Sequence, residues 1–219
     1  KPEGNWENKI ILVEKEKPDK DLIKKLLSIR SKRNKPFFDD KTQLDLNCLW
    51  ISSLVHADEI LPEKGYLKQA EEFFLRVEKK YINQKIYHSY SKEIVFIEDY
   101  AFLINALNDL QDKTMNFKYK DLALKMTNEA VSKFFLKDKN IFQKNSIDNN
   151  DVFFKPIDIG DGAIPNGNAI MLINFIRLGM MDMAEKLSAG LNSYLNIYKN
   201  HMMTSLRALD FFKNIVDGK

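Results

Sequence analysis

The sequence predicts an all-α fold built from antiparallel helix hairpins, with a short β-hairpin in one long loop. Apolar residues recur with the helical period along most of the 219 residues, and Pro and Gly separate the periodic stretches. A two-helix unit also repeats weakly, with a small residue at equivalent places: Ala70, Ala123 and Ala184. Since one such pair cannot bury its apolar faces alone, the pairs must stack, either as a curved solenoid or as part of an α/α toroid.

The helices are expected in order after an extended N-terminal segment, residues 1–18, that has little periodicity. Asp19 is a suitable N-cap for the first helix, which reaches about Arg33 and ends before Pro36. The later helices are expected over residues 44–61, 66–81, 98–111, 117–136, 168–178, 182–198 and 202–216. We therefore expect a single domain over residues 1–219, in which residues 19–219 form the helical hairpins.

The β-hairpin is expected within residues 137–159. Turn-forming residues at 148–151 lie there between two short apolar runs, Ile141-Phe142 and Val152-Phe153-Phe154. This places the predicted strands in the loop that precedes the helix at residue 168.

Composition excludes several classes of protein. Hydrophobic residues make up 44% and charged residues 30%, which is typical of a globular chain rather than a disordered one. The net charge of +3, with Lys interleaved among Asp and Glu, predicts no nucleic-acid partner. The chain has no apolar run long enough for a bilayer, so no membrane partner is expected. The lone Cys48 excludes an internal disulfide and fits a reducing, cytoplasmic compartment.

Motifs for common cofactors and metals are also missing from the sequence. It contains neither a P-loop nor a dinucleotide-binding fingerprint, so no cofactor is expected. His56 and His201 lack a third ligand in a recognisable pattern, so no metal is expected either.

The loop at residues 156–168 concentrates polar side chains, glycines and prolines just before an apolar run. Asn166 is placed to cap the helix that follows. A rigid polar loop at a helix N-terminus suits a polar or anionic ligand. The alternative is a well-formed helix entrance in which Asp158 and Asp161 bond their own backbone.

Three long polar loops, at residues 37–41, 87–98 and 154–168, each link an outer helix to the next inner one, so they should gather on one rim. Paired carboxylates across a cleft suit general acid and base work on a sugar. The candidate catalytic residues are Asp39, Asp40, Glu98, Asp99 and Asp161. The candidate ligand-binding residues are Asn47, His88, Tyr100, Asp158, Asn166 and Asn168.

Several of the candidates also have a structural explanation. First-turn acids such as Glu98 and Asp99 match the helix dipole. Asp39 and Asp40 precede Lys41 and can form a local ion pair. His88 can be an ordinary polar side chain.

Several segments resemble a known family in order and spacing over nearly the whole chain. The most specific are Glu98-Asp99-Tyr100-Ala101-Phe102-Leu103-Ile104 and Asp161-Gly162-Ala163-Ile164-Pro165-Asn166-Gly167-Asn168. Others are His88-Ser89-Tyr90 and Asp39-Asp40-Lys41. They resemble the C-terminal part of the thioredoxin-domain proteins typified by spermatogenesis-associated protein 20. One departure is Leu46-Asn47-Cys48, where the family usually has Trp, Asn and Gly.

The resemblance implies a six-hairpin α/α toroid like that of glycosidases and N-acylglucosamine 2-epimerases. In full-length family members a thioredoxin-like domain precedes the toroid. This chain begins at Lys1 and has no such segment, so we expect a fragment that lacks that domain and the first hairpins. An open toroid edge would then favour self-association.

Two functions follow. The first is a carbohydrate-like ligand cleft with sugar epimerase, isomerase or glycosidase-like activity. The second is a non-catalytic helical module that accompanies a thioredoxin-like domain. A deep cleft with buried carboxylates would favour the first function, and exposed carboxylates without a cleft would favour the second.

Overall fold

The computed structural model describes residues 3–4, 6–11, 13, 16–17, 19–82, 85–89, 94–149 and 153–218, arranged as two compact units. The first unit, Lys1–Asp40, contains helix α1 (Lys20–Ser31). The side chain of Asp19 accepts a hydrogen bond from the Asp21 backbone N–H, which confirms the predicted N-cap. The assignment of residues 1–219 to one domain stays a prediction.

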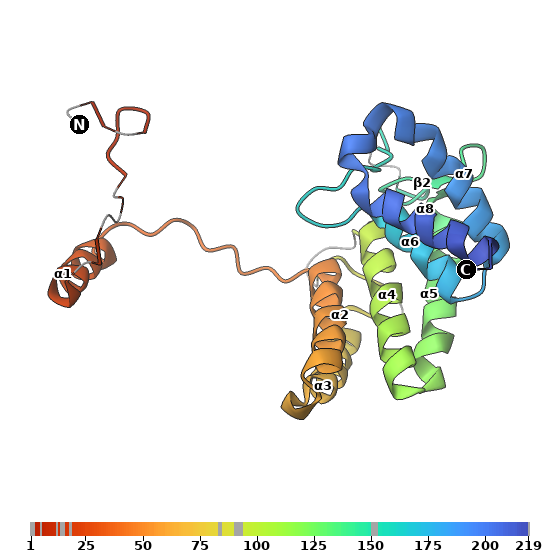
Figure 1. Cartoon of the computed structure of the whole chain (residues 1–219), viewed down its shortest axis with the longest axis horizontal. Coiled ribbons are helices and arrows are strands. Elements are labelled where there is room, and N and C mark those ends of the chain that lie inside the picture. Colours follow the sequence, from red (N-terminus) through yellow and green to blue (C-terminus); the bar gives the residue numbers. More distant parts are fainter. Residues whose placement is uncertain are drawn as a thin grey trace. The chain divides into compact units, whose positions relative to one another are not determined.

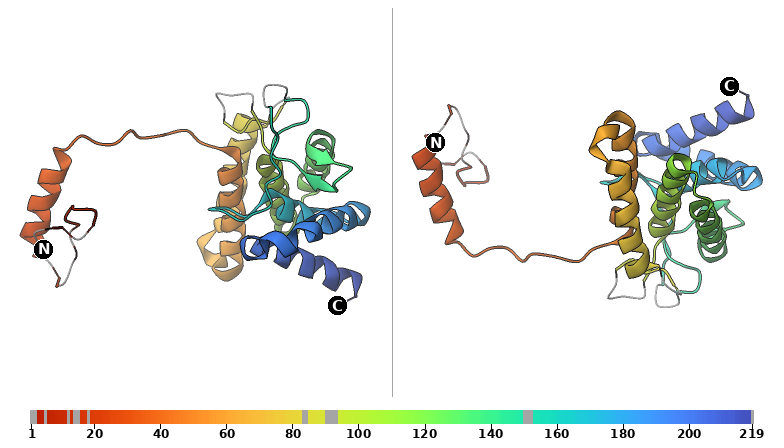
Figure 2. Two further views of the ribbon diagram at one scale, coloured as in Figure 1. Left: turned by 90° about the horizontal axis from the view of Figure 1, so that it is seen from above. Right: turned by 90° about the horizontal axis from the view of Figure 1, so that it is seen from below.

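The second unit, Lys41–Lys219, is a row of inner helices with an outer helix packed against each of the first three (Figures 1 and 2). The inner helices contact one another in sequence order and are α2 (Leu44–Ile60), α4 (Ile97–Thr114), α6 (Gly167–Arg177) and α8 (Met203–Val216). The outer helices are α3 (Tyr66–Tyr81), α5 (Phe117–Phe134) and α7 (Met181–Tyr198). Short 3₁₀ turns at Pro62–Lys64 and Lys199–His201 complete the described helical structure. This confirms the predicted all-α array of antiparallel hairpins.

Helix α4 is the centre of the core. It packs against α2, α5 and α6, and 13 of its 18 residues are buried. Its buried apolar side chains include Phe102, Leu103 and Leu107. Because polar residues at its N-terminus are buried too, the start of α4 combines core packing with polar contacts.

The loops alternate in length along this array. Inner helices pass to outer ones through tight turns, such as Met115-Asn116 between α4 and α5. Helices α3 and α5 return to the next inner helix through long connections, residues 82–96 and 143–166, whereas the short stretch 199–202 joins α7 to α8. All four inner helices consequently begin at the same end of the unit.

The predicted β-hairpin exists, but its strands differ from those expected. Strand β1 (Phe135–Leu136) pairs antiparallel with β2 (Ile141–Phe142), with the turn at residues 137–140. The expected partner run includes Val152, which lies outside the described residues, whereas Phe153 and Phe154 are exposed loop residues. The α5 helix therefore ends at Phe134, because the next two residues leave it to form β1.

The turn of this hairpin packs directly on α7, at a position without a side chain. A Cβ atom added at Gly190 would lie 2.1 Å from the backbone oxygen of Asn140. Asn140 itself has a left-handed backbone, with φ of 52°. Gly190 therefore fixes how closely the hairpin approaches the helix.

Two further properties of the second unit concern its surface. Leu46 and Trp50 on α2 are 47% and 56% exposed, so apolar side chains do lie on the first inner helix. Self-association through this edge stays a prediction. Among the described residues, no helix combines the length and apolar character that crossing a bilayer requires.

We predict that Gly190→Ala destabilises the protein by about 1–3 kcal/mol, because the added methyl group collides with backbone atoms that cannot rotate away. In an ordinary helix the same change stabilises by about 0.5–1 kcal/mol. Urea unfolding measures the difference. The neighbouring exposed change Ala189→Gly is the control and should cost only the usual helix propensity. A stabilised Gly190→Ala variant would contradict the close approach.

Candidate functional site

A pocket of about 510 Å³ lies at the end of the second unit where the inner helices begin. Residues from two of the three predicted polar loops, 87–98 and 154–168, reach it. Its lining consists of Asp45, His88, Phe96, Glu98, Lys144, Asp158, Gly160, Asp161, Gly162, Ile164, Pro165, Asn166 and His201. Five of the sequence-predicted candidates therefore come together there: His88, Glu98, Asp158, Asp161 and Asn166.

Acidic side chains occupy the first backbone N–H groups around this pocket. An Asp45 oxygen accepts from the N–H of Leu46 at 2.8 Å, at the start of α2. An Asp99 oxygen accepts from the N–H of Phe96 at 2.9 Å, which closes the start of α4. These bonds satisfy donors that a helix leaves unpaired at its N-terminus.

Asp161 performs this role for two helices at once. One carboxylate oxygen accepts from the backbone N–H of Asn166 at 3.1 Å, just before α6, and from its side-chain amide at 3.0 Å. The other accepts from the N–H of Thr204 at 2.7 Å, in the first turn of α8. Burial opposes ionisation, but these hydrogen bonds outweigh it and lower the pKa of Asp161. Asp161 thus joins α6 and α8 as a charged bridge.

Asn166 completes this arrangement as the N-cap of α6. Its side-chain oxygen accepts from the N–H of Ala169 at 2.9 Å, which confirms the predicted cap. Its amide also donates to the hydroxyl of Ser205 at 3.2 Å. The side chain is therefore fully used by the protein.

Glu98 differs from the other acids of the pocket. Its side chain is nine-tenths buried, and its Oε2 atom has no hydrogen-bond partner. Its nearest described cation is Lys144, whose Nζ atom lies 3.9 Å from Oε1. Burial raises the pKa of Glu98, and the nearby Lys144 only partly opposes the rise. A buried carboxyl that has one unpartnered oxygen and a raised pKa is a candidate acid or base.

The part-buried His88 pairs with the fully buried Asp99 beside Glu98. The Nδ1 atom of His88 lies 2.9 Å and 3.1 Å from the two Asp99 oxygens, and Nε2 lies 2.7 Å from the Gln43 amide. The hydrogen bond with Asp99 raises the pKa of His88 against the opposing effect of burial. The pair therefore favours a protonated imidazole held in one orientation.

Asp45 lies close to this pair. Ligand atoms of Asp45, His88 and Asp99 are within 4.8 Å of one another, a spacing that a metal ion could use. However, His88 Nδ1 already bonds Asp99, and Asp99 also holds the Phe96 N–H. Two of the three groups therefore already have partners within the protein. Burial, followed by the charge of Asp99, raises the pKa of Asp45.

Lys144 links two acids across the pocket. Its Nζ atom bonds Asp158 at 3.1 Å and lies 3.9 Å from Glu98. Burial disfavours the charged amine, but Glu98 and Asp158 outweigh it and raise the pKa of Lys144. Lys144 therefore keeps its charge in the pocket.

Three predicted ligand-binding residues do not line the pocket. Asn47 donates to the Gln43 carbonyl at 2.5 Å within its own helical turn. Tyr100 is fully buried and donates to Glu129 of α5 at 2.8 Å. Asn168, also fully buried, bonds both backbone groups of Phe142 and so joins β2 to α6. These side chains stabilise the scaffold.

Asp39 and Asp40 belong to the first unit, where both are exposed in the extended segment after α1. Their catalytic assignment stays a prediction. Conversely, Asp45, Lys144 and His201 line the pocket although sequence reasoning did not select them. Asp45 could have been found as a first-turn acid, equivalent to Glu98 and Asp99. Nothing in the sequence around Lys144 marks it.

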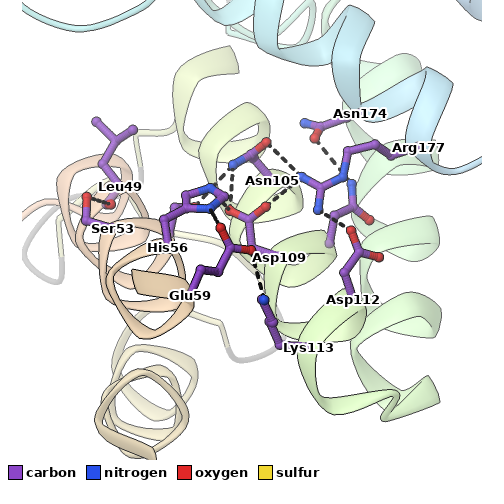
Figure 3. A network of polar contacts seen from close by, with 12 residues as sticks. Leu49, Ser53, His56, Glu59, Asn105, Asp109, Asp112, Lys113, Asn174 and Arg177 are labelled. Carbon is purple, nitrogen blue, oxygen red and sulfur yellow. Dashed lines mark hydrogen bonds and ion pairs between the residues drawn. The ribbon is translucent and has the colours of Figure 1, made fainter. Parts of the chain in front are cut away.

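A second polar network closes the opposite end of the inner helices (Figure 3). Arg177 of α6 bonds Asp109 and Asp112 of α4, each at 2.7 Å. Asn105 links Asp109 to Ser52 of α2 at 2.9 Å and 3.1 Å. Here the buried Asp109 has partners on two sides, so this network ties three inner helices together.

Comparisons with known proteins agree with the fold. No family model matches the chain. Uncharacterized protein B0495.5 of Caenorhabditis elegans is 29% identical over 174 residues, which cover 74% of this chain and 23% of that protein. The chain thus spans less than a quarter of this relative. The structure of cellobiose 2-epimerase from Bacillus thermoamylovorans B4167 matches with a TM-score of 0.52 and 18% identity, over 73% of this chain and 44% of the epimerase.

The fold is that of the α/α toroids. The inner and outer layers of the second unit and the likeness to the epimerase support this together. The expectation from the sequence resemblance, a partial six-hairpin toroid, is confirmed at the level of the fold. At this identity the likeness carries no information about the reaction.

The His88–Asp99 pair predicts a pH-dependent stability. Because the folded pKa of His88 lies above its ordinary value of 6.5, the pair contributes fully below pH 6.5. The contribution is lost as the pH rises through the raised pKa. Unfolding free energies of wild type and His88→Gln, measured from pH 5.5 to 9, should converge with rising pH. Asp99→Asn should show the same convergence, and a constant difference would contradict the pair.

Asp161→Ala should destabilise the protein by about 2 kcal/mol, since it removes charge-assisted bonds to two helix starts. Hydrogen exchange should show the loss at the N–H of Thr204 and in the first turn of α8. Asp210→Ala, an exposed acid on α8 itself, is the matched control and should stay within about 0.5 kcal/mol. Unchanged protection of α8 in Asp161→Ala would show that the bridge is dispensable.

Proposed function

We propose that the pocket binds a carbohydrate-like ligand and moves a proton on it, as a sugar 2-epimerase does. The observation that carries this proposal is Glu98, whose Oε2 atom is buried without a partner at the edge of a 510 Å³ pocket. Leaving a carboxylate oxygen unsatisfied costs stability. A ligand hydroxyl or a transferred proton would satisfy it.

The roles in this reaction follow from the environments of the two titratable groups. Glu98, with its raised pKa, takes the proton from the carbon next to the sugar carbonyl. Lys144, which keeps its charge and lies 3.9 Å from Glu98, donates a hydrogen bond to the carbonyl oxygen as negative charge develops there. The enediolate then rotates in the pocket, and Glu98 returns a proton to the opposite face of the same carbon, which gives the epimer. Environments that shift two neighbouring groups in this way are typical of acid–base sites.

A glycosidase-like reaction is less well supported. Hydrolysis needs a second carboxylate free to act opposite the first. Asp161 uses both oxygens on backbone N–H groups, and Asp158 is paired with Lys144. Asp45 holds the N–H of Leu46 at the start of α2. These contacts favour proton transfer next to a carbonyl over hydrolysis.

We also propose membership of the family typified by spermatogenesis-associated protein 20. Its two specific motifs in this sequence begin at Glu98 and at Asp161, and both residues line the pocket. The alternative function, an interaction module for a thioredoxin-like domain, predicts exposed carboxylates and no cleft. The buried Glu98 and its pocket favour the ligand-binding function.

The test is proton exchange with solvent. Wild-type protein incubated in D₂O with aldose sugars should incorporate deuterium at C2, followed by NMR. Glu98→Gln keeps the size of the side chain but cannot accept the proton, so the rate should fall by roughly 10²-fold or more. Glu63→Gln removes an exposed acid beyond the far end of α2 and should leave the rate unchanged. Equal rates in wild type and Glu98→Gln would refute the assignment.

A further inference from the structure

The pocket carries an excess of negative charge among the described residues. Four carboxylates line it, and a fifth, Asp99, is bonded to the lining residue His88. The lining side chains that can carry positive charge are Lys144, His88 and His201. Even with all three protonated, the carboxylates outnumber the cations.

The helix N-termini do not offset this excess. Four helices begin near the pocket, and such ends usually attract anions through their free N–H groups. Here the protein's own acids already hold several of those groups, at Leu46, Phe96, Asn166 and Thr204. The anion site suggested by the sequence of the 156–168 loop is therefore occupied by Asp161.

Glu98 then determines which ligand group fits best. Its Oε2 atom accepts no hydrogen bond, and its nearest described cation is shared with Asp158 at the shorter distance of 3.1 Å. An ammonium group brings up to three donors and a positive charge. A phosphate dianion brings only acceptors and would face several carboxylates.

We propose that the pocket selects a sugar that carries a free ammonium group over one that carries an anion, with Glu98 Oε2 accepting from the ammonium. This rests on the proposed carbohydrate function and adds the charge class of the ligand. The neutral parent sugar should bind with intermediate affinity.

Calorimetric titrations at pH 7, in a buffer without amine or phosphate, test the order with a matched series: glucosamine, glucose and glucose 6-phosphate. Glucosamine should bind about tenfold more tightly than glucose, since a charge-assisted hydrogen bond replaces a neutral one. Its advantage should shrink with added NaCl. Glu98→Gln should bring the ratio of the two affinities close to one, whereas Glu63→Gln should preserve it.

Two compounds that are not sugars separate this inference from the proposed function: Tris, an amine with three hydroxyls, and glycerol 3-phosphate. If the sugars bind but glucose 6-phosphate binds as tightly as glucosamine or more tightly, the proposed charge selection is wrong. The proposed sugar pocket would then still stand. Binding of Tris alone, lost in Glu98→Gln, would support charge selection and refute the sugar function. If none of the compounds binds, both the charge selection and the proposed sugar function are wrong.

Discussion

The structure depends on one constraint: four inner helices begin at the same rim, and their first N–H groups need acceptors. Tight turns lead from inner to outer helices, and long loops lead back from α3 and α5, so the polar loops meet where these N–H groups point. Asp45, Asp99 and Asp161 supply acceptors within this rim. The same acids then define the charge of the pocket between them, so helix capping and ligand preference have a common physical origin.

Much of the fold could be predicted because the period of the apolar residues indicates which face of a helix is buried, and Pro and Gly indicate where helices end. The caps at Asp19 and Asn166 and the boundaries of most helices follow from local chemistry, whose partners are two or three residues away. The partner strand of β2 could not be predicted in this way. Phe135–Leu136 continues the helical pattern of α5. Long-range contacts give the hairpin its place: its turn packs on α7 at Gly190, and Asn168 of α6 bonds the backbone of Phe142.

The site was harder to predict than the fold, since the presence of a polar residue in a sequence does not reveal its hydrogen-bond partner. Tyr100 and Asn168 belong to polar motifs, yet their partners are Glu129 and the Phe142 backbone. Lys144 is the reverse case: it lines the pocket but was not selected, because no local pattern indicates that it lies between Glu98 and Asp158. Long-range contacts decide both cases, and a single sequence does not contain them.

Buried acids at the two ends of the inner helices differ in how fully they are hydrogen-bonded. At the far end Asp109 is held by Arg177 and Asn105, and Asp112 is held by Arg177 as well. At the rim Glu98 and Asp99 are neighbours in the first turn of α4. Because consecutive residues of a helix point in different directions around its axis, the two side chains have different surroundings. Asp99 turns back to its own helix start and to His88, whereas Glu98 enters the pocket with one oxygen unsatisfied. Among the described residues, Glu98 Oε2 is the buried carboxylate oxygen that accepts no hydrogen bond, which leaves it for a ligand.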